Sequence, residues 1–96
     1  MSENGTKPQL VFFHTPSSGR CRRVDGFLAQ VLQRRANHET FRVHRVDVDQ
    51  DGALVERFQI ETVPTLVVVD DKRVKGRLEA PRGCRDIERL LAPWLH

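Results

Sequence analysis

The hydrophobic pattern divides the chain into alternating strands and helices. A short apolar run at residues 9–14 lies between Pro8 and a Pro-Ser-Ser-Gly turn, which is typical of a buried strand. The next segment, residues 19–36, places apolar side chains three and four residues apart and therefore predicts a helix with one core-facing side. The apolar positions of this helix are Val24, Phe27, Leu28, Val31 and Leu32.

A second strand is predicted at residues 41–48. Phe41 and Val43 would point to one face of a sheet, and Val46 and Val48 to the other. A strand with apolar side chains on both sides is expected inside a sheet that is covered on both faces.

A short helix, a hairpin and a final helix complete the pattern. We expect the short helix at residues 53–58, with Asp49 or Asp51 as its cap. The apolar run at 65–69 and the charged run at 73–78 flank a tight turn, which predicts a hairpin with its second strand at a sheet edge. The last helix follows Pro81-Arg82-Gly83, and its apolar face is formed by Cys84, Ile87, Leu90, Leu91 and Trp94.

The order of elements predicts an α/β fold. Two strands joined by a helix should be parallel, with a right-handed crossover, and the hairpin adds an antiparallel pair. Helices on both faces then give a three-layer α/β/α sandwich, βαβαββα, around a mixed four-stranded sheet. We expect a single domain at residues 9–96, preceded by a flexible leader at residues 1–8.

Composition narrows the function classes. The chain has 96 residues and a formal net charge of +3, with its 16 Lys and Arg spread along the sequence rather than in one dense stripe. Because only 6% of the residues are aromatic, we expect a solvated surface and no nucleic-acid partner, although a basic RNA- or phosphate-associated domain is a weak alternative. No apolar run approaches the ~20 residues of a membrane helix, and the first residues lack a signal-peptide core, so we expect no membrane partner and a cytoplasmic protein with reduced cysteines.

The turn after the first strand carries the most informative motif, Ser18-Gly19-Arg20-Cys21. A strand-to-helix turn that ends in C-x-x-C is the arrangement of a thiol–disulfide exchanger. Such an enzyme needs one thiolate to attack and a second thiol to resolve the mixed disulfide. The hydroxyl of Ser18 can do neither, so the motif keeps only half of this chemistry.

The chain resembles the thioredoxin superfamily over residues 9–95, without the family's first strand and helix. The resemblance rests on residues 12–21, which match the strand and active-site turn, on Val46–Asp49 with 58–60, and on Thr62-Val63-Pro64-Thr65. It implies a thioredoxin fold with a cis Val63–Pro64 peptide bond. It also implies that the backbone of Val63 faces the active-site turn and pairs with an extended peptide or glutathione.

Four positions depart from the family pattern. Ser18 stands where the attacking cysteine is expected, and Ser17 replaces the tryptophan before the motif. Phe12 replaces the buried carboxylate that moves protons, and His14 replaces another aromatic residue. Ordinary insulin-reducing activity should therefore be absent or very weak.

Two interpretations of Cys21 are open. As a lone reactive thiol it would benefit from the helix N-terminus and from Arg20, Arg22 and Arg23, and the Ser18 hydroxyl would contact its sulfur. As a core residue it would be a small buried hydrophobe, because it continues the apolar stripe of its helix.

These interpretations give two hypotheses for function. In the first, the protein is a binding module that grips a partner between the Ser17–Cys21 turn, including Gly19 and Arg20, and Val63–Pro64. In the second, it is a single-thiol oxidoreductase or redox sensor that uses Cys21, with Ser18 assisting and His14 modulating. Whether it is an enzyme therefore depends on Cys21.

The expected partner is a protein or peptide, with glutathione as an alternative, and the chain itself should be a monomer or weak homodimer. No cofactor and no metal are expected, because His38, His44 and His96 lack metal-ligand spacing. Cys84 is expected in the core, away from any disulfide with Cys21.

Overall fold

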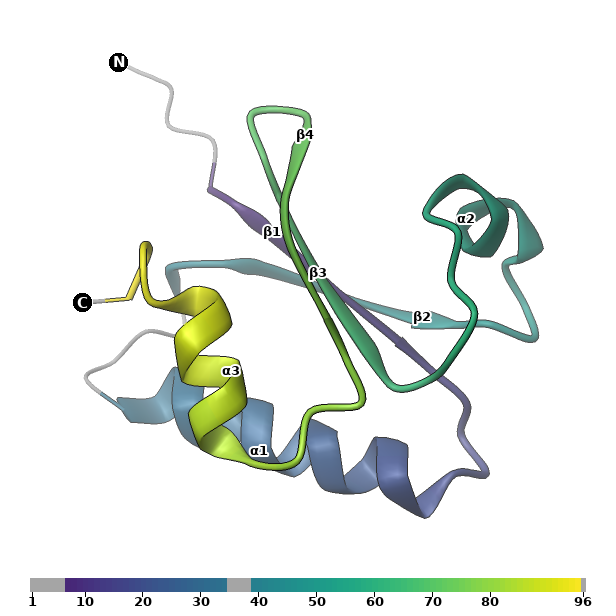
Figure 1. Ribbon diagram of the computed structural model, residues 1–96, viewed down its shortest axis with the longest axis horizontal. Coiled ribbons are helices and arrows are strands. Elements are labelled where there is room, and N and C mark those ends of the chain that lie inside the picture. The colour runs from purple at the N-terminus through teal and green to yellow at the C-terminus, as the bar shows by residue number, and fades with distance from the viewer. Residues whose placement is uncertain (1–6, 35–38, 96) are drawn as a thin grey trace.

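The computed structural model describes residues 7–34 and 39–95. The elements occur in the predicted order, and most of their ends lie within one or two residues of those expected from the sequence (Figure 1). They are β1 (Gln9–His14), α1 (Gly19–Gln33), β2 (Arg42–Asp47), α2 (Gly52–Arg57), β3 (Thr65–Asp70), β4 (Arg73–Glu79) and α3 (Cys84–Leu91).

The four strands form one mixed sheet in the order β2-β1-β3-β4. β1 runs parallel to β2 and antiparallel to β3, and β3 and β4 form the predicted hairpin. In this register Phe13 lies opposite Val46 on one side and Thr65 on the other. The carboxyl end of β1 and the beginning of β3 therefore meet at the same end of the sheet, where the site residues were expected.

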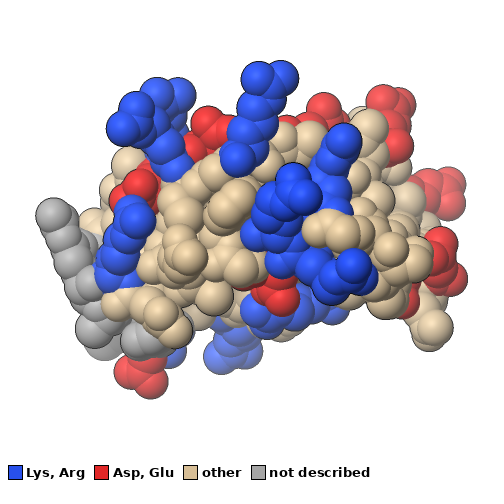
Figure 2. Space-filling view, turned by 90° about the horizontal axis from the view of Figure 1, so that it is seen from below, with Lys and Arg blue, Asp and Glu red and all other residues tan. Residues whose placement is uncertain are grey.

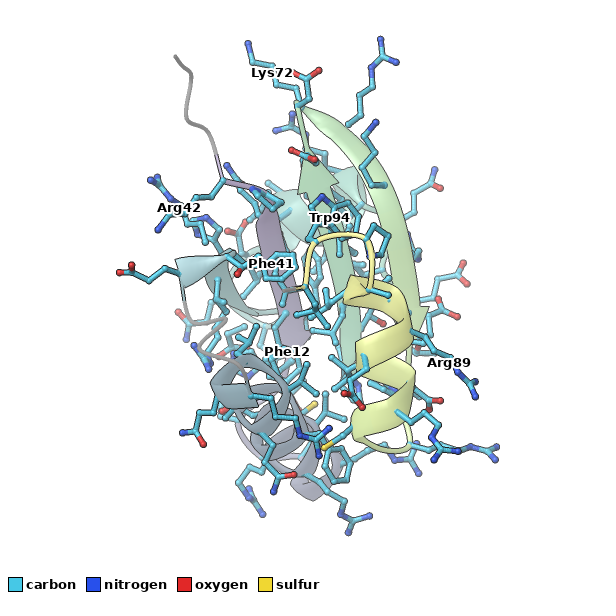
Figure 3. The ribbon with its side chains drawn as sticks, turned by 90° about the vertical axis from the view of Figure 1, so that its left-hand side faces the viewer. Phe12, Phe41, Arg42, Lys72, Arg89 and Trp94 are labelled. Atoms are coloured by element: carbon cyan, nitrogen blue, oxygen red, sulfur yellow. The ribbon has the colours of Figure 1, made fainter. Side chains whose placement is uncertain are left out.

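The two faces of the sheet carry separate apolar clusters, which confirms the predicted three layers. Leu10 and Phe12 of β1 pack with α1 and α3, and Phe12 lies between the sheet and the helices (Figure 3). Val11 and Phe13, which point the opposite way, pack with Leu54 of α2. Because α2 is short, part of this second face is left as a hollow of about 830 Å³.

Trp94 anchors the end of the chain to the first face. Its ring meets Phe41 edge to face, with ring centroids 6.1 Å apart, and the two labelled side chains lie together in Figure 3. Its indole Nε1 donates a hydrogen bond to Asp70 at the end of β3, at 3.1 Å. The predicted role of Trp94 as an anchor for the last helix is consistent with these two contacts.

The β3–β4 turn is tight because two consecutive residues have a positive φ, Asp71 at 54° and Lys72 at 64°. Two such residues give the turn the twist that a two-residue hairpin needs. Further along β4, Gly76 lies under α3, where an added Cβ would come within 2.7 Å of the Leu90 side chain. A glycine therefore lets α3 approach the edge strand closely.

The end of α1 differs from its prediction by more than the ends of the strands do. α1 ends at Gln33 rather than at Ala36, because Arg34 already has an extended backbone. The last core-facing residues of this helix are Val31 and Leu32, and its predicted end, Ala36, lies outside the described residues.

The predicted leader falls mostly outside the described residues, which begin at Lys7. At its end, the carbonyl oxygen of Pro8 accepts a hydrogen bond from the Arg42 amide at 2.9 Å. Among the described residues, no helix combines the length and the hydropathy needed to cross a bilayer.

Candidate functional site

The turn between β1 and α1 holds the S-x-x-C motif, and the hydroxyl group of Ser18 caps the helix. The Ser18 amide donates to the Thr15 carbonyl oxygen at 3.2 Å. The Ser18 backbone is extended, and its Oγ accepts a hydrogen bond from the Cys21 amide at 3.2 Å. Ser18 rather than Ser17 is therefore the cap, and it pairs one of the unsatisfied amides at the helix N-terminus. Within the described residues this hydroxyl makes no hydrogen bond to the Cys21 sulfur, the contact that the reactive-thiol interpretation would need.

Cys21 lies in the first turn of α1 and belongs to the core. Only 2% of its surface is exposed, and it shares a buried cluster with Phe12, Val24 and Leu28. It is a free cysteine. A thiol buried to this extent is shielded from a protein disulfide, which would have to bring a second chain into contact with the sulfur.

A small cavity of about 160 Å³ reaches Cys21 from the side of β2. His14 stacks on Phe12 with ring centroids 5.3 Å apart, and both rings line this cavity. Two further residues of its wall, Asp25 and Arg45, form an ion pair at 2.9 Å. An apolar ring thus stands where the family's carboxylate is expected. Asp25, the carboxylate in this lining, is paired with Arg45, and the Arg22 guanidinium donates a hydrogen bond to the Pro16 carbonyl oxygen at 3.2 Å.

The proline segment lies at the same end of the sheet as the S-x-x-C turn (Figure 1). The Val63–Pro64 peptide bond is cis. Pro64 is buried and its carbonyl oxygen accepts a hydrogen bond from the Ala80 amide at 2.8 Å. Val63 is half-buried and packs against the apolar clusters of both faces. The segment is therefore held by the residue after β4 on one side and by the core beneath it.

The residues predicted to bind a partner differ in their exposure. Ser17, Gly19 and Arg20 are exposed, whereas Val63 is half-buried and Pro64 is buried. The exposed members come from the turn and the first turn of α1, so a partner would meet these before it reached the proline.

A groove of about 520 Å³ runs beside this turn, between the first half of α1 and the residues after β4. Arg20 lines it together with Arg23 and Phe27 of α1 and with Pro81 and Arg82. Of these residues, only Arg20 was predicted from the sequence to bind a partner. The signal for Arg23 and Phe27 was present, since residues three and seven positions after Arg20 share its side of a helix. Arg82 joins them only through the fold.

Cys84 contacts α1 rather than the S-x-x-C turn. Its Sγ lies 3.2 Å from Oε1 of Gln30 and 3.7 Å from the carbonyl oxygen of Phe27, and it is a free cysteine. It is half-buried at the start of α3 and packs against the same core cluster as Cys21. Among the residues that the structure describes, no group of three His, Cys, Asp or Glu side chains is placed to hold a metal ion.

The comparisons with known proteins agree with this architecture. A profile of the thioredoxin family matches residues 2–93, and the chain belongs to that family. A thioredoxin of Mycobacterium tuberculosis is 30% identical over 80 residues, which cover 83% of this chain and 67% of the relative. The chloroplastic thioredoxin Y of Oryza sativa is 27% identical over 93 residues, covering 93% of this chain and 54% of that protein.

Solved structures show the same fold. A protein called Trxlp from Edwardsiella tarda superposes with a TM-score of 0.81 at 20% identity, covering 91% of this chain and 84% of that one. The germline-specific thioredoxin Deadhead from Drosophila melanogaster superposes with a TM-score of 0.79 at 20% identity, covering 93% and 82%. At this level of identity the likeness concerns the fold alone.

Proposed function

We propose that this thioredoxin-family protein does not exchange dithiols for disulfides and instead binds a protein or peptide partner beside its S-x-x-C turn. The observation that carries the proposal is the state of the motif. The Ser18 hydroxyl is used as a helix cap, and Cys21 is 2% exposed. The motif therefore provides helix stability and core packing in place of two cooperating thiols.

The missing chemistry can be stated step by step. In an exchanger, a thiolate attacks one sulfur of the substrate disulfide, and a second thiol then displaces the reduced substrate from the mixed disulfide. Serine at position 18 forms no mixed disulfide, and Cys21 has no thiol partner in the motif. Phe12, at the position of the family's carboxylate, holds no proton to transfer.

The binding role is supported by what stays in place. The cis Val63–Pro64 segment and the exposed turn residues Ser17, Gly19 and Arg20 lie at one end of the sheet. An extended partner can pair with backbone groups there by strand addition, which needs no thiol. We place this function in the cytoplasm, where two free cysteines stay reduced.

One observation favours a second candidate, a single-thiol peroxide sensor. The 160 Å³ cavity that reaches Cys21 is large enough for a small oxidant but not for a protein disulfide. In that reaction the Cys21 thiolate would attack one peroxide oxygen, the O–O bond would break, and hydroxide would leave. Cys21 would become a sulfenic acid. Two equivalents of a small thiol would then reduce it back to the thiol, and the products would be the disulfide of the small thiol and one water molecule.

The test measures access to Cys21 in a Cys84→Ser background. On the proposed function, alkylation of Cys21 in the native protein is at least about a hundredfold slower than in guanidinium, because a buried group reacts only through local opening. Insulin reduction in the presence of dithiothreitol should not exceed that of the Cys21→Ser variant. The Cys84→Ser protein itself serves as the control for folding.

Two results would contradict the proposal. Insulin reduction well above the Cys21→Ser background would show that one thiol is enough for exchange. Rapid labelling of Cys21 by a sulfenic-acid reagent, after one equivalent of hydrogen peroxide and without denaturant, would favour the peroxide sensor instead.

A further inference from the structure

The groove beside α1 combines an arginine rim with an apolar floor. It measures about 520 Å³ and is lined by Arg20, Arg23 and Phe27 of α1 and by Pro81 and Arg82 of the segment after β4. Arg20, Arg23 and Arg82 are all exposed, whereas Phe27 is half-buried and packs against the core. The groove thus has charged edges and a floor fixed by the fold.

The arginines of the groove have no carboxylate partner within the described residues. The ion pairs found in the described part of the chain join Arg34 to Glu88, Arg45 to Asp25 and Arg77 to Glu79. None of them includes Arg20, Arg23 or Arg82. Glu79 lines the groove, but it lies 3.6 Å from Arg77, which offsets its charge. Asp86 accepts a hydrogen bond from the backbone amide of Arg82, not from its guanidinium.

Three guanidinium groups around one concave surface create a positive potential that attracts anions. Figure 2 shows Lys and Arg side chains gathered on the face seen from below, which α1 crosses, with Asp and Glu mostly towards its edges. Guanidinium groups bind carboxylates in a planar, often bidentate geometry. An apolar floor between such groups favours a ligand that also carries hydrophobic side chains.

We infer that this groove binds an acidic, extended segment of the partner protein, with carboxylates on Arg20, Arg23 and Arg82 and an apolar side chain over Phe27. The inference rests on the proposed function, because it names the chemistry of that partner. The groove adjoins the proposed site, since Ala80, in its wall, donates its amide hydrogen to the Pro64 carbonyl oxygen at 2.8 Å. One extended peptide can therefore follow both surfaces.

The groove fits a peptide better than a nucleic acid. Alternate side chains of an extended peptide point to opposite sides, so carboxylates and apolar groups can reach the rim and the floor together. A nucleic acid presents phosphates at a regular spacing and needs a longer basic stripe with stacking surfaces. Phe27 is the single aromatic ring in this lining, and the chain carries a net charge of only +3.

The experiment measures binding of a fluorescent peptide in which Glu alternates with Leu, using the full-length wild-type protein. Arg23→Glu with Arg82→Glu should weaken binding by about tenfold or more, since hydrogen bonds between charged groups are lost and repulsion replaces them. Arg73→Glu with Arg89→Glu makes the same change of charge on β4 and α3 outside the groove lining and should change the affinity by less than about twofold. Amide NMR of the wild-type protein should show shifts at residues 20–27 and 79–82.

Each outcome has a defined meaning. Equal weakening by both pairs of substitutions would overturn the inference, because it would show that net charge alone acts. NMR shifts confined to residues outside 20–27 and 79–82 would overturn it too, because the peptide would then bind elsewhere. Tighter binding of a single-stranded oligonucleotide at the same residues would overturn it in favour of a nucleic acid. If a neutral extended peptide binds at Val63 and the acidic one does not bind, the inference fails while the proposed function stands. If no peptide binds at all, both fail.

Discussion

The side-chain oxygen of Ser18 accepts a hydrogen bond from the backbone amide of Cys21 at 3.2 Å. These two residues occupy the ends of the motif in which a dithiol thioredoxin would hold its two sulfurs. The first position has become a structural cap of α1, and the second is part of the core. On the function that we propose, a hydroxyl at the first position of the motif stabilises the helix start but cannot take part in disulfide exchange.

The cap can be measured directly. Ser18→Ala removes the acceptor for the Cys21 amide and should lower the free energy of unfolding by about 1 kcal/mol. Chemical denaturation followed by the fluorescence of Trp94 gives this difference. Ser17→Ala is the matched control and should change the stability by less than about 0.5 kcal/mol, because Ser17 is exposed and does not cap the helix. Equal effects of the two substitutions would show that the cap contributes nothing.

Restoring the sulfur should restore part of the chemistry. Ser18→Cys recreates a C-x-x-C motif, and after mild oxidation the intact mass should fall by two hydrogens through a bond to Cys21. In the presence of dithiothreitol, this variant should reduce insulin faster than the wild-type protein. It should stay slower than the relatives with an intact motif, because Phe12 supplies no carboxylate for proton transfer.

A shifted thiol provides the control for that experiment. Ser17→Cys adds the same group one residue earlier, outside the two-residue spacing, and should show neither the mass change nor the gain in rate. If Ser18→Cys remains fully reduced while Cys84 is replaced by serine, then burial of Cys21 prevents the pairing. The idea that only the missing sulfur separates this turn from an exchanger would then be wrong.

Much of the fold could be predicted from the sequence because local signals agree with the tertiary structure. β1 was predicted with both its ends, since Pro8 and the turn residues after His14 limit the apolar run. The two faces of β2 were predicted from alternation alone, and Val43 and Val46 indeed pack in different clusters. Where a signal was ambiguous, as between Asp49 and Asp51, the structure selected Asp51 as the cap of α2.

Several tertiary contacts of arginine were not predictable, because they join residues far apart in the chain. Arg45 meets Asp25 across 20 positions, and Arg77 donates hydrogen bonds of 2.6 Å to the carbonyl oxygens of Phe58 and Gln59. Long polar side chains reach many partners, so their spacing in the sequence carries little information. For the same reason, the sequence could not place Arg82 beside Arg20 and Arg23.

The hydrogen bond between Trp94 and Asp70 offers a local probe of the chain's end. Asp70→Ala leaves the indole without its acceptor and should cost about 1 kcal/mol of stability, with a shift of the tryptophan emission. Asp70→Asn keeps an acceptor for the indole, so its stability and its tryptophan emission should both stay close to those of the wild-type protein. Asp49→Ala removes a carboxylate outside this contact and should leave the emission unchanged. A shift of the same size in Asp49→Ala would show that the emission reports charge rather than this bond.

Replacing glycine by alanine should have opposite effects on stability at Gly26 in α1 and at Gly76 in β4, because only Gly76 lies close to α3. Gly26→Ala, on the exposed side of α1, brings the new methyl group within 4 Å of nothing outside its own stretch of helix. It should stabilise the protein by about 0.5–1 kcal/mol through helix propensity. Gly76→Ala places its methyl group 2.7 Å from Cδ1 of Leu90 and should destabilise it by about 1 kcal/mol, because the end of that side chain must move. In a Leu90→Ala background the clash disappears, so the penalty of Gly76→Ala should vanish or change sign, as a double-mutant cycle of denaturation midpoints would measure. An undiminished penalty in that background would place the cause in the strand itself, not in the packing of α3.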